Sequence, residues 1–194
     1  MGVDYSARVV PYLGELEAGD GFVIDERPNG VLVVVIDVLG HGEQAAVLAR
    51  EIERFIQHSR DWPVAGLMTA LHQHLRGTLG AAATMVFFDT RAWVAEGIGV
   101  GNTLMRQVWP KTRSFPAKSG VIGEMLPNLL PFQCSFQPGD MFVFTSDGIS
   151  ENLDEEEVSA AAIISCDAVV GLLFERYAKE FDDATALAIR FRDE

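Results

Sequence analysis

Cysteine, positive charge and long apolar runs are all scarce in this chain of 194 residues. The two cysteines, Cys134 and Cys166, could pair, but two buried, reduced thiols are the simpler interpretation and fit a reducing cytoplasm. Lys and Arg number 15 against 28 Asp and Glu, so the net charge is −13 without a basic patch. This balance argues against nucleic acid or an anionic membrane as a partner. No apolar run reaches the roughly 18 residues of a transmembrane helix, so we expect a cytoplasmic protein.

The sequence also lacks internal repeats, low-complexity tracts and linkers, so residues 1–194 are interpreted as one domain. Hydrophobic residues make up 48% and charged residues 22%, which suits a soluble domain with a substantial core. Apolar runs and alternation predict strands at 21–27, 31–36, 82–89, 93–100, 104–109, 132–136, 141–145 and 185–191. Apolar residues three and four apart predict helices from 43 to a break at Asp61–Pro63, from 63 to about 76, at 155–164 and at 168–179.

Turn signals predict how these strands pair. Asn29-Gly30 and Thr90-Arg91 each separate two predicted strands and indicate hairpins, and 104–109 is expected to continue the second as a meander. The turn 137–140 predicts a further hairpin between its flanking strands. Residues 110–130 contain prolines and glycines and are predicted to be irregular.

Hairpin strands interrupted by two helix pairs indicate an α+β architecture rather than alternating βαβ units. Each predicted helix pair has an apolar stripe, which must be covered by a sheet. We therefore predict a four-layer αββα sandwich, in which two mainly antiparallel β-sheets pack face to face with a helix pair outside each.

Acidic residues recur where predicted strands begin or end. Asp37 ends the run Val31–Ile36, Asp147 follows Met141–Thr145, and Asp20 and Asp182-Asp183 stand beside other strands. This repetition predicts one convergent carboxylate cluster, which needs cations because clustered carboxylates repel one another. Aspartates are good ligands for magnesium and manganese, and two such ions about 4 Å apart can activate water for an in-line displacement.

The histidines do not form a zinc site. His41 and His58 are isolated, and no cluster of Cys and His has zinc spacing. His72 and His74 lie two apart on a predicted helix and therefore point in different directions. We interpret both as surface or boundary residues.

The order of the motifs resembles a known family. The motifs are Gly19-Asp20-Gly21, Asp37-Val38-Leu39-Gly40-His41-Gly42, Gly101-Asn102, Pro138-Gly139-Asp140, Thr145-Ser146-Asp147-Gly148-Ile149-Ser150-Glu151 and Asp182-Asp183-Ala184-Thr185. They resemble the metal-dependent PPM protein serine/threonine phosphatases, in particular the bacterial branch that contains SpoIIE, RsbU and RsbX. The resemblance runs from residue 19 to 185 and implies the four-layer fold predicted above.

The resemblance also implies the ligands of two divalent metal ions, Mn²⁺ or Mg²⁺. Asp37 resembles the carboxylate that bridges both metals, and the backbone carbonyl of Val38 resembles a second ligand from that loop. Asp147 and Asp182 resemble the other direct ligands, and Asp20 resembles an acid that holds a metal or a metal-bound water. The catalytic set implied for this chain is therefore these four aspartates.

Other positions match the family less directly. Asp183 stands where relatives carry Asn or Asp, and we include it among the candidate metal residues. Gly40 and Gly42 are expected to let the loop turn tightly into the helix that begins near Glu43. His41 lies four residues after Asp37, whereas the eukaryotic branch has a histidine two residues after its bridging aspartate, so we predict a loop-packing or hydrogen-bonding role. Asn102 is interpreted either as a residue that lines the site or as a turn residue.

Size and loops indicate a possible substrate. Asp20 occurs almost at the start, which predicts a catalytic domain without a separate regulatory domain and resembles the RsbX-type feedback phosphatases of the stressosome. That resemblance implies phosphoserine or phosphothreonine on stressosome proteins with STAS domains as the substrate. Lys111, Arg113 and Lys118 in the loop 110–130 are a candidate docking element, and a solvated connection is the alternative.

Three other functions remain to be weighed. Gly97-Ile98-Gly99-Val100-Gly101 is glycine-rich, but a strand rather than a helix is predicted to follow, so it is a weak nucleotide-binding signal. A haloacid-dehalogenase-type phosphatase needs an aspartate where Leu39 stands. A catalytically inactive PPM-like protein-binding module is the more serious alternative, although such modules normally lack metal carboxylates, and all are present here.

Overall fold

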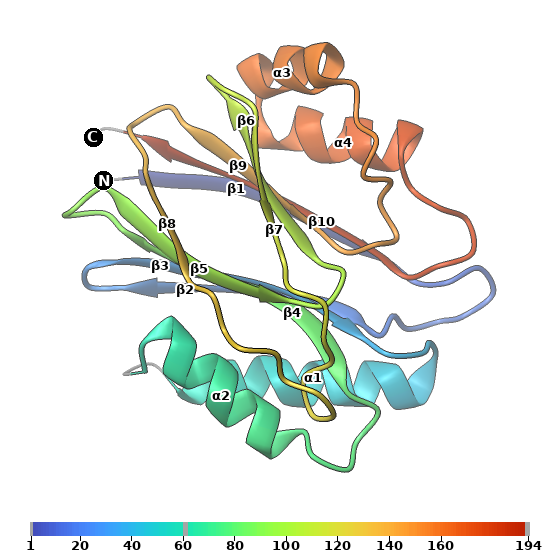
Figure 1. Cartoon of the computed structure of the whole chain (residues 1–194). Coiled ribbons are helices and arrows are strands. Elements are labelled where there is room, and N and C mark those ends of the chain that lie inside the picture. The colour runs from blue at the N-terminus through green and yellow to red at the C-terminus, as the bar shows by residue number, and fades with distance from the viewer. Residues whose placement is uncertain (1, 60–61, 193–194) are drawn as a thin grey trace.

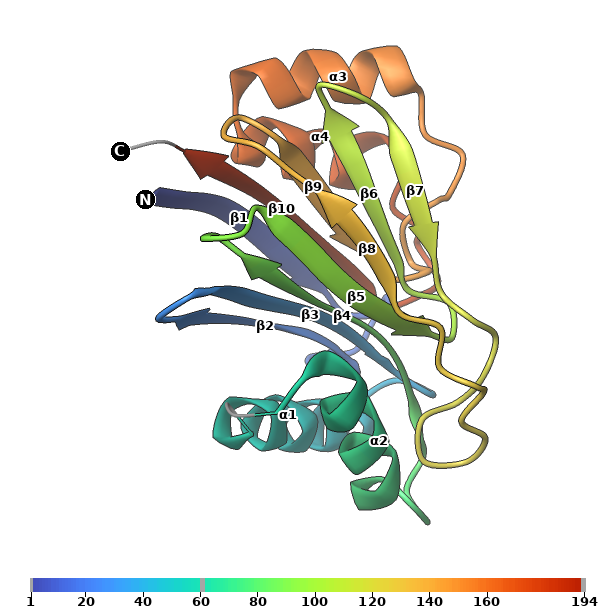
Figure 2. The ribbon, with the colours of Figure 1, turned by 60° about the vertical axis from the view of Figure 1, so that its left-hand side comes forward.

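The computed structural model describes residues 2–59 and 62–192, so Asp61 of the predicted helix break lies outside the described residues. Two five-stranded sheets pack face to face (Figures 1 and 2). Helices α1 (Glu43–His58) and α2 (Val64–His74) cover the outer face of one sheet. Helices α3 (Glu155–Ile164) and α4 (Cys166–Arg176) cover the outer face of the other. The predicted α+β sandwich of four layers is confirmed.

Both sheets are antiparallel throughout. The sheet beneath α1 and α2 has the strand order β2 (Asp20–Arg27), β3 (Gly30–Val38), β4 (Ala81–Asp89), β5 (Val94–Val100), β8 (Phe132–Ser135). The sheet beneath α3 and α4 has the order β1 (Gly2–Val10), β10 (Ala184–Arg192), β9 (Met141–Thr145), β6 (Leu104–Trp109), β7 (Arg113–Pro116).

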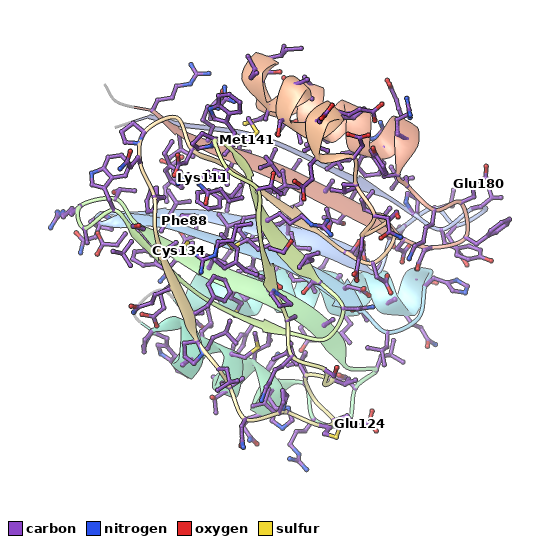
Figure 3. All side chains as sticks on the ribbon, turned by 45° about the horizontal axis from the view of Figure 1, so that its top comes forward. Phe88, Lys111, Glu124, Cys134, Met141 and Glu180 are labelled. Carbon is purple, nitrogen blue, oxygen red and sulfur yellow. The ribbon has the colours of Figure 1, made fainter. Side chains whose placement is uncertain are left out.

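The apolar run of β3 is continuous because both faces of its sheet are covered. Odd-numbered residues from Val31 to Val35 pack between the sheets, whereas even-numbered residues from Leu32 to Ile36 pack beneath the helices. The layer between the sheets is rich in aromatic rings around Phe88 (Figure 3). The Phe88 ring centroid lies 4.8 Å from that of Phe191 and 5.1 Å from that of Phe142, which joins the two sheets.

The predicted hairpin around 137–140 is wrong. β8 pairs with β5 in one sheet, whereas β9 pairs with β10 and β6 in the other, so the turn crosses between sheets. All five residues of β9 are buried, and a strand buried on both faces is stabilised between two neighbours in the centre of a sheet. The turn residues specify that the chain reverses direction, but they do not specify which sheet the next strand joins.

The prediction that 104–109 continues the meander is also wrong. β6 leaves the sheet of β5 and pairs with β7 and β9 instead. Residues 110–130 are not wholly irregular, because residues 113–116 form β7. β1 was not predicted, since its residues are half-buried or exposed and carry weak alternation. Its pairing with β10 over its full length makes it the edge of the second sheet.

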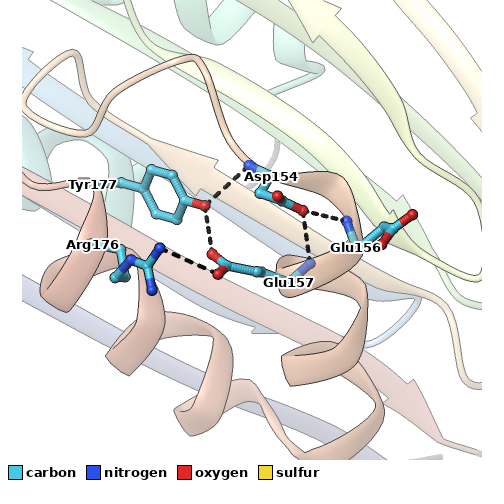
Figure 4. Close-up of polar contacts among 5 residues, drawn as sticks. All are labelled: Asp154, Glu156, Glu157, Arg176 and Tyr177. Atoms are coloured by element: carbon cyan, nitrogen blue, oxygen red, sulfur yellow. Dashed lines mark hydrogen bonds and ion pairs between the residues drawn. The ribbon is translucent and has the colours of Figure 1, made fainter.

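Helix α4 ends before the predicted limit at 179 because the backbone that follows it forms hydrogen bonds with the loop after β9. The carbonyl of Tyr177 accepts from the Ser150 N–H (2.8 Å), and the Lys179 N–H donates to the Gly148 carbonyl (2.8 Å). The Tyr177 hydroxyl donates to Glu157 Oε2 (2.9 Å) and accepts from the Asp154 N–H (3.1 Å), as Figure 4 shows. The end of α4 is thereby fastened both to this loop and to the start of α3.

Two side-chain predictions have different outcomes. Cys134 and Cys166 are free and buried, as predicted. The surface or boundary prediction is wrong for His72, which is buried and accepts the Gly123 N–H at Nδ1 (2.9 Å). His74 is exposed, as predicted, and its Nε2 lies 2.8 Å from Glu51 Oε1. Within 2–59 and 62–192, no helix is both long and apolar enough to cross a membrane.

Candidate metal centre

Asp20 and Asp37 face each other at one end of the first sheet. Asp20 begins β2, Asp37 is the second-last residue of β3, and the two are direct partners in the antiparallel register. Direct partners have Cβ atoms about 4.5–5.5 Å apart, so two like charges are forced together. Such a pair is destabilising unless a proton or a cation neutralises it.

The second sheet brings Asp147 and Asp182 to the same region. Asp147 follows β9, and Asp182 precedes the neighbouring strand β10. Just beyond the end of β9, the Ser146 N–H still donates to the Thr185 carbonyl of β10 (3.1 Å). A Cβ at Gly148 would lie 1.9 Å from the Asp183 carbonyl oxygen. Only glycine therefore allows the turn after Asp147 to approach the start of β10 this closely.

The electrostatics show that the acids from the two sheets share one site. The pKa of Asp37 is raised to about 8, first by burial and then by the negative charges of Asp20, Asp147, Asp182 and Asp183. Burial likewise raises the pKa of Asp20 to about 7, with a smaller contribution from the acids of the second sheet. Burial and the Asp147 carboxylate raise the pKa of Asp182. Without a cation, part of this cluster must hold protons at neutral pH.

Two buried oxygens make the cluster suitable for a hard cation. Asp20 Oδ2 and Asp37 Oδ2 have no hydrogen-bond partner among the described residues, and an unpartnered buried carboxylate oxygen is costly. Across 2–59 and 62–192, no three acidic, His or Cys side chains are already arranged around a single ion. The donors are all oxygens, and magnesium and manganese prefer such ligands.

Asp183 holds the loop between β1 and β2 against the cluster. Its Oδ1 accepts the Tyr12 N–H (2.6 Å), and its Oδ2 accepts the Gly19 N–H (2.7 Å). The Gly19 carbonyl in turn accepts the Val38 N–H (3.1 Å). Asp183 therefore links the start of β10 in one sheet to the residue before β2 in the other, and Val38 bonds to that same residue from β3. Coordination of a metal by Asp183 and Val38 stays a prediction, as it does for Asp20, Asp37, Asp147 and Asp182.

Asn102 lies in the bend between β5 and β6, and its side chain also contacts a candidate site residue. Its Nδ2 donates to Asp147 Oδ2 at 2.5 Å. This contact spans 45 residues, so the sequence signal was limited to a polar residue after a strand. His41 packs in its loop as predicted, with its ring stacked on Tyr12 and its Nδ1 3.0 Å from Glu15 Oε1. Gly40 and Gly42 have φ values of 92° and 78° before α1 begins at Glu43.

Arg106 is a neighbour of the site that the sequence did not indicate. Its Nη2 donates to the Glu151 carbonyl at 2.7 Å and so supports the loop after Asp147 from β6. Figure 4 shows the support on the other side of this loop, where Tyr177 contacts Asp154. The segment that carries Asp147 is thus fixed from both sides.

The three cations in 110–130 lie at separate points of that segment, and their role in docking stays a prediction. Lys111 and Arg113 line a pocket with Asp140, before the start of β9, whereas Asp147 follows the end of that strand. Figure 3 likewise shows Lys111 far from Glu180. Lys118 instead exchanges backbone hydrogen bonds with Gly99 and Gly101.

Sequence comparison connects this carboxylate arrangement to a family. The profile of the family described as Stage II sporulation protein E (SpoIIE) matches residues 27–192, which is most of the chain. The chain belongs to the SpoIIE family. No curated protein matches this SpoIIE-family chain closely enough to count as a relative.

Solved structures resemble the SpoIIE-family chain over nearly its whole length. One, from work described as "The bacterial stressosome: a modular system that has been adapted to control secondary messenger signaling", is 26% identical with a TM-score of 0.90, covering 98% of this chain and 100% of the other. RsbX in complex with magnesium is 16% identical with a TM-score of 0.86, covering 97% and 94%.

A third neighbour is the catalytic domain of the serine/threonine protein phosphatase PstP in complex with two manganese ions. It is 15% identical with a TM-score of 0.75, covering 98% of the SpoIIE-family chain and 99% of PstP. At the identities of RsbX and PstP, the similarity shows the shared fold of the PPM-type phosphatases and not a shared substrate.

Proposed function

We propose that the protein is a metal-dependent protein serine/threonine phosphatase that hydrolyses phosphoserine or phosphothreonine by attack of a metal-activated water. One observation carries the proposal. Aspartates from two different sheets converge, and the facing pair Asp20 and Asp37 keeps a buried, unpartnered oxygen on each side chain. A purely structural site would satisfy these oxygens with donors.

The proposed cofactors are two divalent ions, Mn²⁺ or Mg²⁺. Asp20, Asp37, Asp147, Asp182 and the Val38 carbonyl would hold them. The adjacent Asp183 is a candidate whose carboxylate already accepts two backbone N–H groups. The magnesium of RsbX and the two manganese ions of PstP support this choice.

When bound, two such ions supply an activated water and stabilise the oxygens of an in-line displacement at phosphorus. The residues of the chain provide the conditions for this chemistry. Asp20 and Asp37 release the protons that their raised pKa values retain, so that their oxygens can bind cations. Asn102 orients the Asp147 carboxylate through its 2.5 Å hydrogen bond, and Asp183 holds the loop over the site.

The proposed substrate is a phosphorylated stressosome protein with a STAS domain, as for an RsbX-like phosphatase. Support comes from the two structural neighbours described with the stressosome and as RsbX. We further propose that residues 1–194 act as one catalytic domain in the cytoplasm. The net charge of −13 supports a protein partner rather than nucleic acid or an anionic membrane.

The test is manganese-dependent release of phosphate from a phosphorylated STAS-domain protein. Asp37→Ala and Asp147→Ala should each abolish turnover while the fold persists by circular dichroism. Asp167→Ala, at an exposed position on α4, is the matched control and should keep wild-type activity. More than a tenth of wild-type activity in either site variant would sink the site assignment. Binding of the phosphoprotein without any release of phosphate would favour the alternative, a catalytically inactive PPM-like binding module.

A further inference from the structure

A groove beside the candidate metal centre has no role in the function proposed above. Its volume is about 350 Å³, within the size range of pockets that bind small ligands. Val10, Pro11, Leu13 and Ala178 give it an apolar lining, and the charged residues Lys179, Glu180 and Asp182 also line it. Because Asp182 belongs to both, the groove and the carboxylate cluster are continuous.

Two exposed apolar side chains lie on the chain segments that form the groove, and we call these two residues its rim. Leu13 is 66% exposed, and Phe181, which lies between the lining residues Glu180 and Asp182, is 68% exposed. Single exposed apolar residues are common on surfaces, but a pair beside an apolar groove marks a binding surface more often. Figure 3 shows Glu180 at the periphery of the molecule, where a partner has access.

Both walls of the groove are fixed relative to the metal centre. On one wall, Tyr12, which precedes Leu13, donates its N–H to Asp183 Oδ1 at 2.6 Å. On the other wall, Lys179 donates its N–H to the carbonyl of Gly148, the residue after Asp147, at 2.8 Å. A group bound in the groove is therefore held at a set position relative to both Asp147 and Asp182, and such preorganisation favours binding.

We propose that this groove binds an apolar side chain next to the phosphorylated residue of a protein substrate. An extended peptide advances about 3.3 Å per residue, so a phosphoryl group at the carboxylates places its near neighbours in sequence over the groove. Lys179 is the cation among the lining residues, and it lies next to the acid Glu180 in sequence. This inference rests on the proposed function, since it specifies the substrate of that same site.

The experiment compares two phosphothreonine peptides of equal charge. One carries leucine and the other serine at the positions flanking the phosphothreonine. With wild-type protein and Mn²⁺, kcat/KM should be about ten-fold higher for the leucine peptide, which corresponds to partial burial of one leucine side chain. Equal kcat/KM values for the two peptides would overturn the proposal.

Leu13→Ser and Phe181→Ser should each reduce this preference at least three-fold, because each removes apolar surface at the rim. Ile163→Ser is the matched control, since Ile163 is also exposed (62%) but lies near the end of α3. Helix α4 separates it from the groove by about 16 Å at 1.5 Å per residue. A preference that stays at the wild-type value in both rim variants would also refute the groove assignment, because the selectivity would then arise elsewhere.

A binding measurement separates this inference from the proposed function. Fluorescence anisotropy with Asp147→Ala protein reports the Kd for each labelled peptide without turnover. Tighter binding of the leucine peptide supports the groove even if the wild type releases no phosphate, an outcome that would defeat only the proposed function. Conversely, if the enzyme is active but has equal Kd and equal kcat/KM for both peptides, the proposed function stands and the proposal about the groove is refuted. A change of oligomeric state in Leu13→Ser would identify a second copy as the occupant and refute the substrate assignment.

Discussion

At the scale of single residues, the proposed site contains side chains that orient the candidate metal ligands as well as the ligands themselves. Asn102 holds Asp147 by a hydrogen bond of 2.5 Å, and Asp183 uses its carboxylate to accept two backbone N–H groups. Replacing a residue that orients a metal ligand typically lowers metal affinity about 10–100-fold. Their contribution can be measured separately from catalysis.

Asn102→Ala should therefore weaken manganese binding about ten-fold, because Asp147 loses the donor that fixes its carboxylate. Isothermal titration calorimetry with Mn²⁺ gives this affinity without any assay of turnover. Asn128→Ala, at an exposed loop position, is the matched control and should bind Mn²⁺ like the wild type. Unchanged affinity in Asn102→Ala would show that the hydrogen bond does not orient a ligand.

The raised pKa values of Asp20 and Asp37 predict how stability varies with pH in the metal-free protein. An unfolded aspartate titrates near pH 4, whereas the folded pKa values are about 7 and about 8. Between these limits the folded state binds more protons, so the free energy of unfolding falls as pH rises from about 4 to about 8 and then levels off.

With chelator present, the unfolding midpoint should be several degrees higher at pH 5.5 than at pH 8.5, since 1 kcal/mol corresponds to about 2–4 °C at this chain length. Asp37→Asn should flatten the dependence, whereas the exposed Asp167→Asn should not. A midpoint that rises with pH in the wild type would contradict the raised pKa values.

At the scale of secondary-structure elements, the site is built from strand ends that two close backbone contacts hold together. β9 and β10 lie side by side, and the turn after Asp147 touches the Asp183 carbonyl at Gly148. The supports from Arg106 and Tyr177 fix the rest of the loop to β6 and α4. The position of Asp147, a candidate metal ligand, thus depends on how closely two backbones approach.

Gly148→Ala tests this contact. The added Cβ would lie 1.9 Å from the Asp183 carbonyl oxygen, so the backbone must shift, and we expect lower stability and weaker Mn²⁺ binding. Gly171→Ala makes the same chemical change in α4, where nothing lies within 4 Å of the new Cβ. That control should be neutral or stabilising by about 0.5–1 kcal/mol, because alanine favours helix over glycine. Thermal melts and Mn²⁺ titrations of both variants provide the comparison, and equal behaviour of the two would disprove the close contact.

At the scale of the whole molecule, the acidic cluster joins the two sheets and sits within a chain of net charge −13. Bound cations would neutralise carboxylates from both sheets at once. Ligands that bind only the folded state stabilise it by mass action, so metal should strengthen the sandwich as a unit.

Millimolar Mn²⁺ should therefore raise the unfolding midpoint relative to chelator by several degrees, and Asp37→Asn should reduce this response. Potassium chloride at equal ionic strength is the control, because it screens charge without occupying the site. The proposal of a metal centre fails if Mn²⁺ and potassium chloride give the same midpoint.

Local sequence patterns predicted much of this fold and its candidate site. Apolar periodicity reports burial, so it located most strands and helices, the α+β class and the four layers. The strand-end positions of Asp20, Asp37, Asp147 and Asp182 also predicted that these acids meet. These features are local, because a residue's place in a strand follows from its near neighbours.

The pairing of the strands and the contacts of each acid could be read only from the folded chain. Periodicity does not identify a partner, so β8 and β9 entered different sheets although a tight turn joins them. The Asn102–Asp147 hydrogen bond and the hold of Asp183 on Gly19 join residues 45 and 164 positions apart. Such contacts depend on the packing of the two sheets, because that packing alone brings distant strand ends within hydrogen-bonding distance.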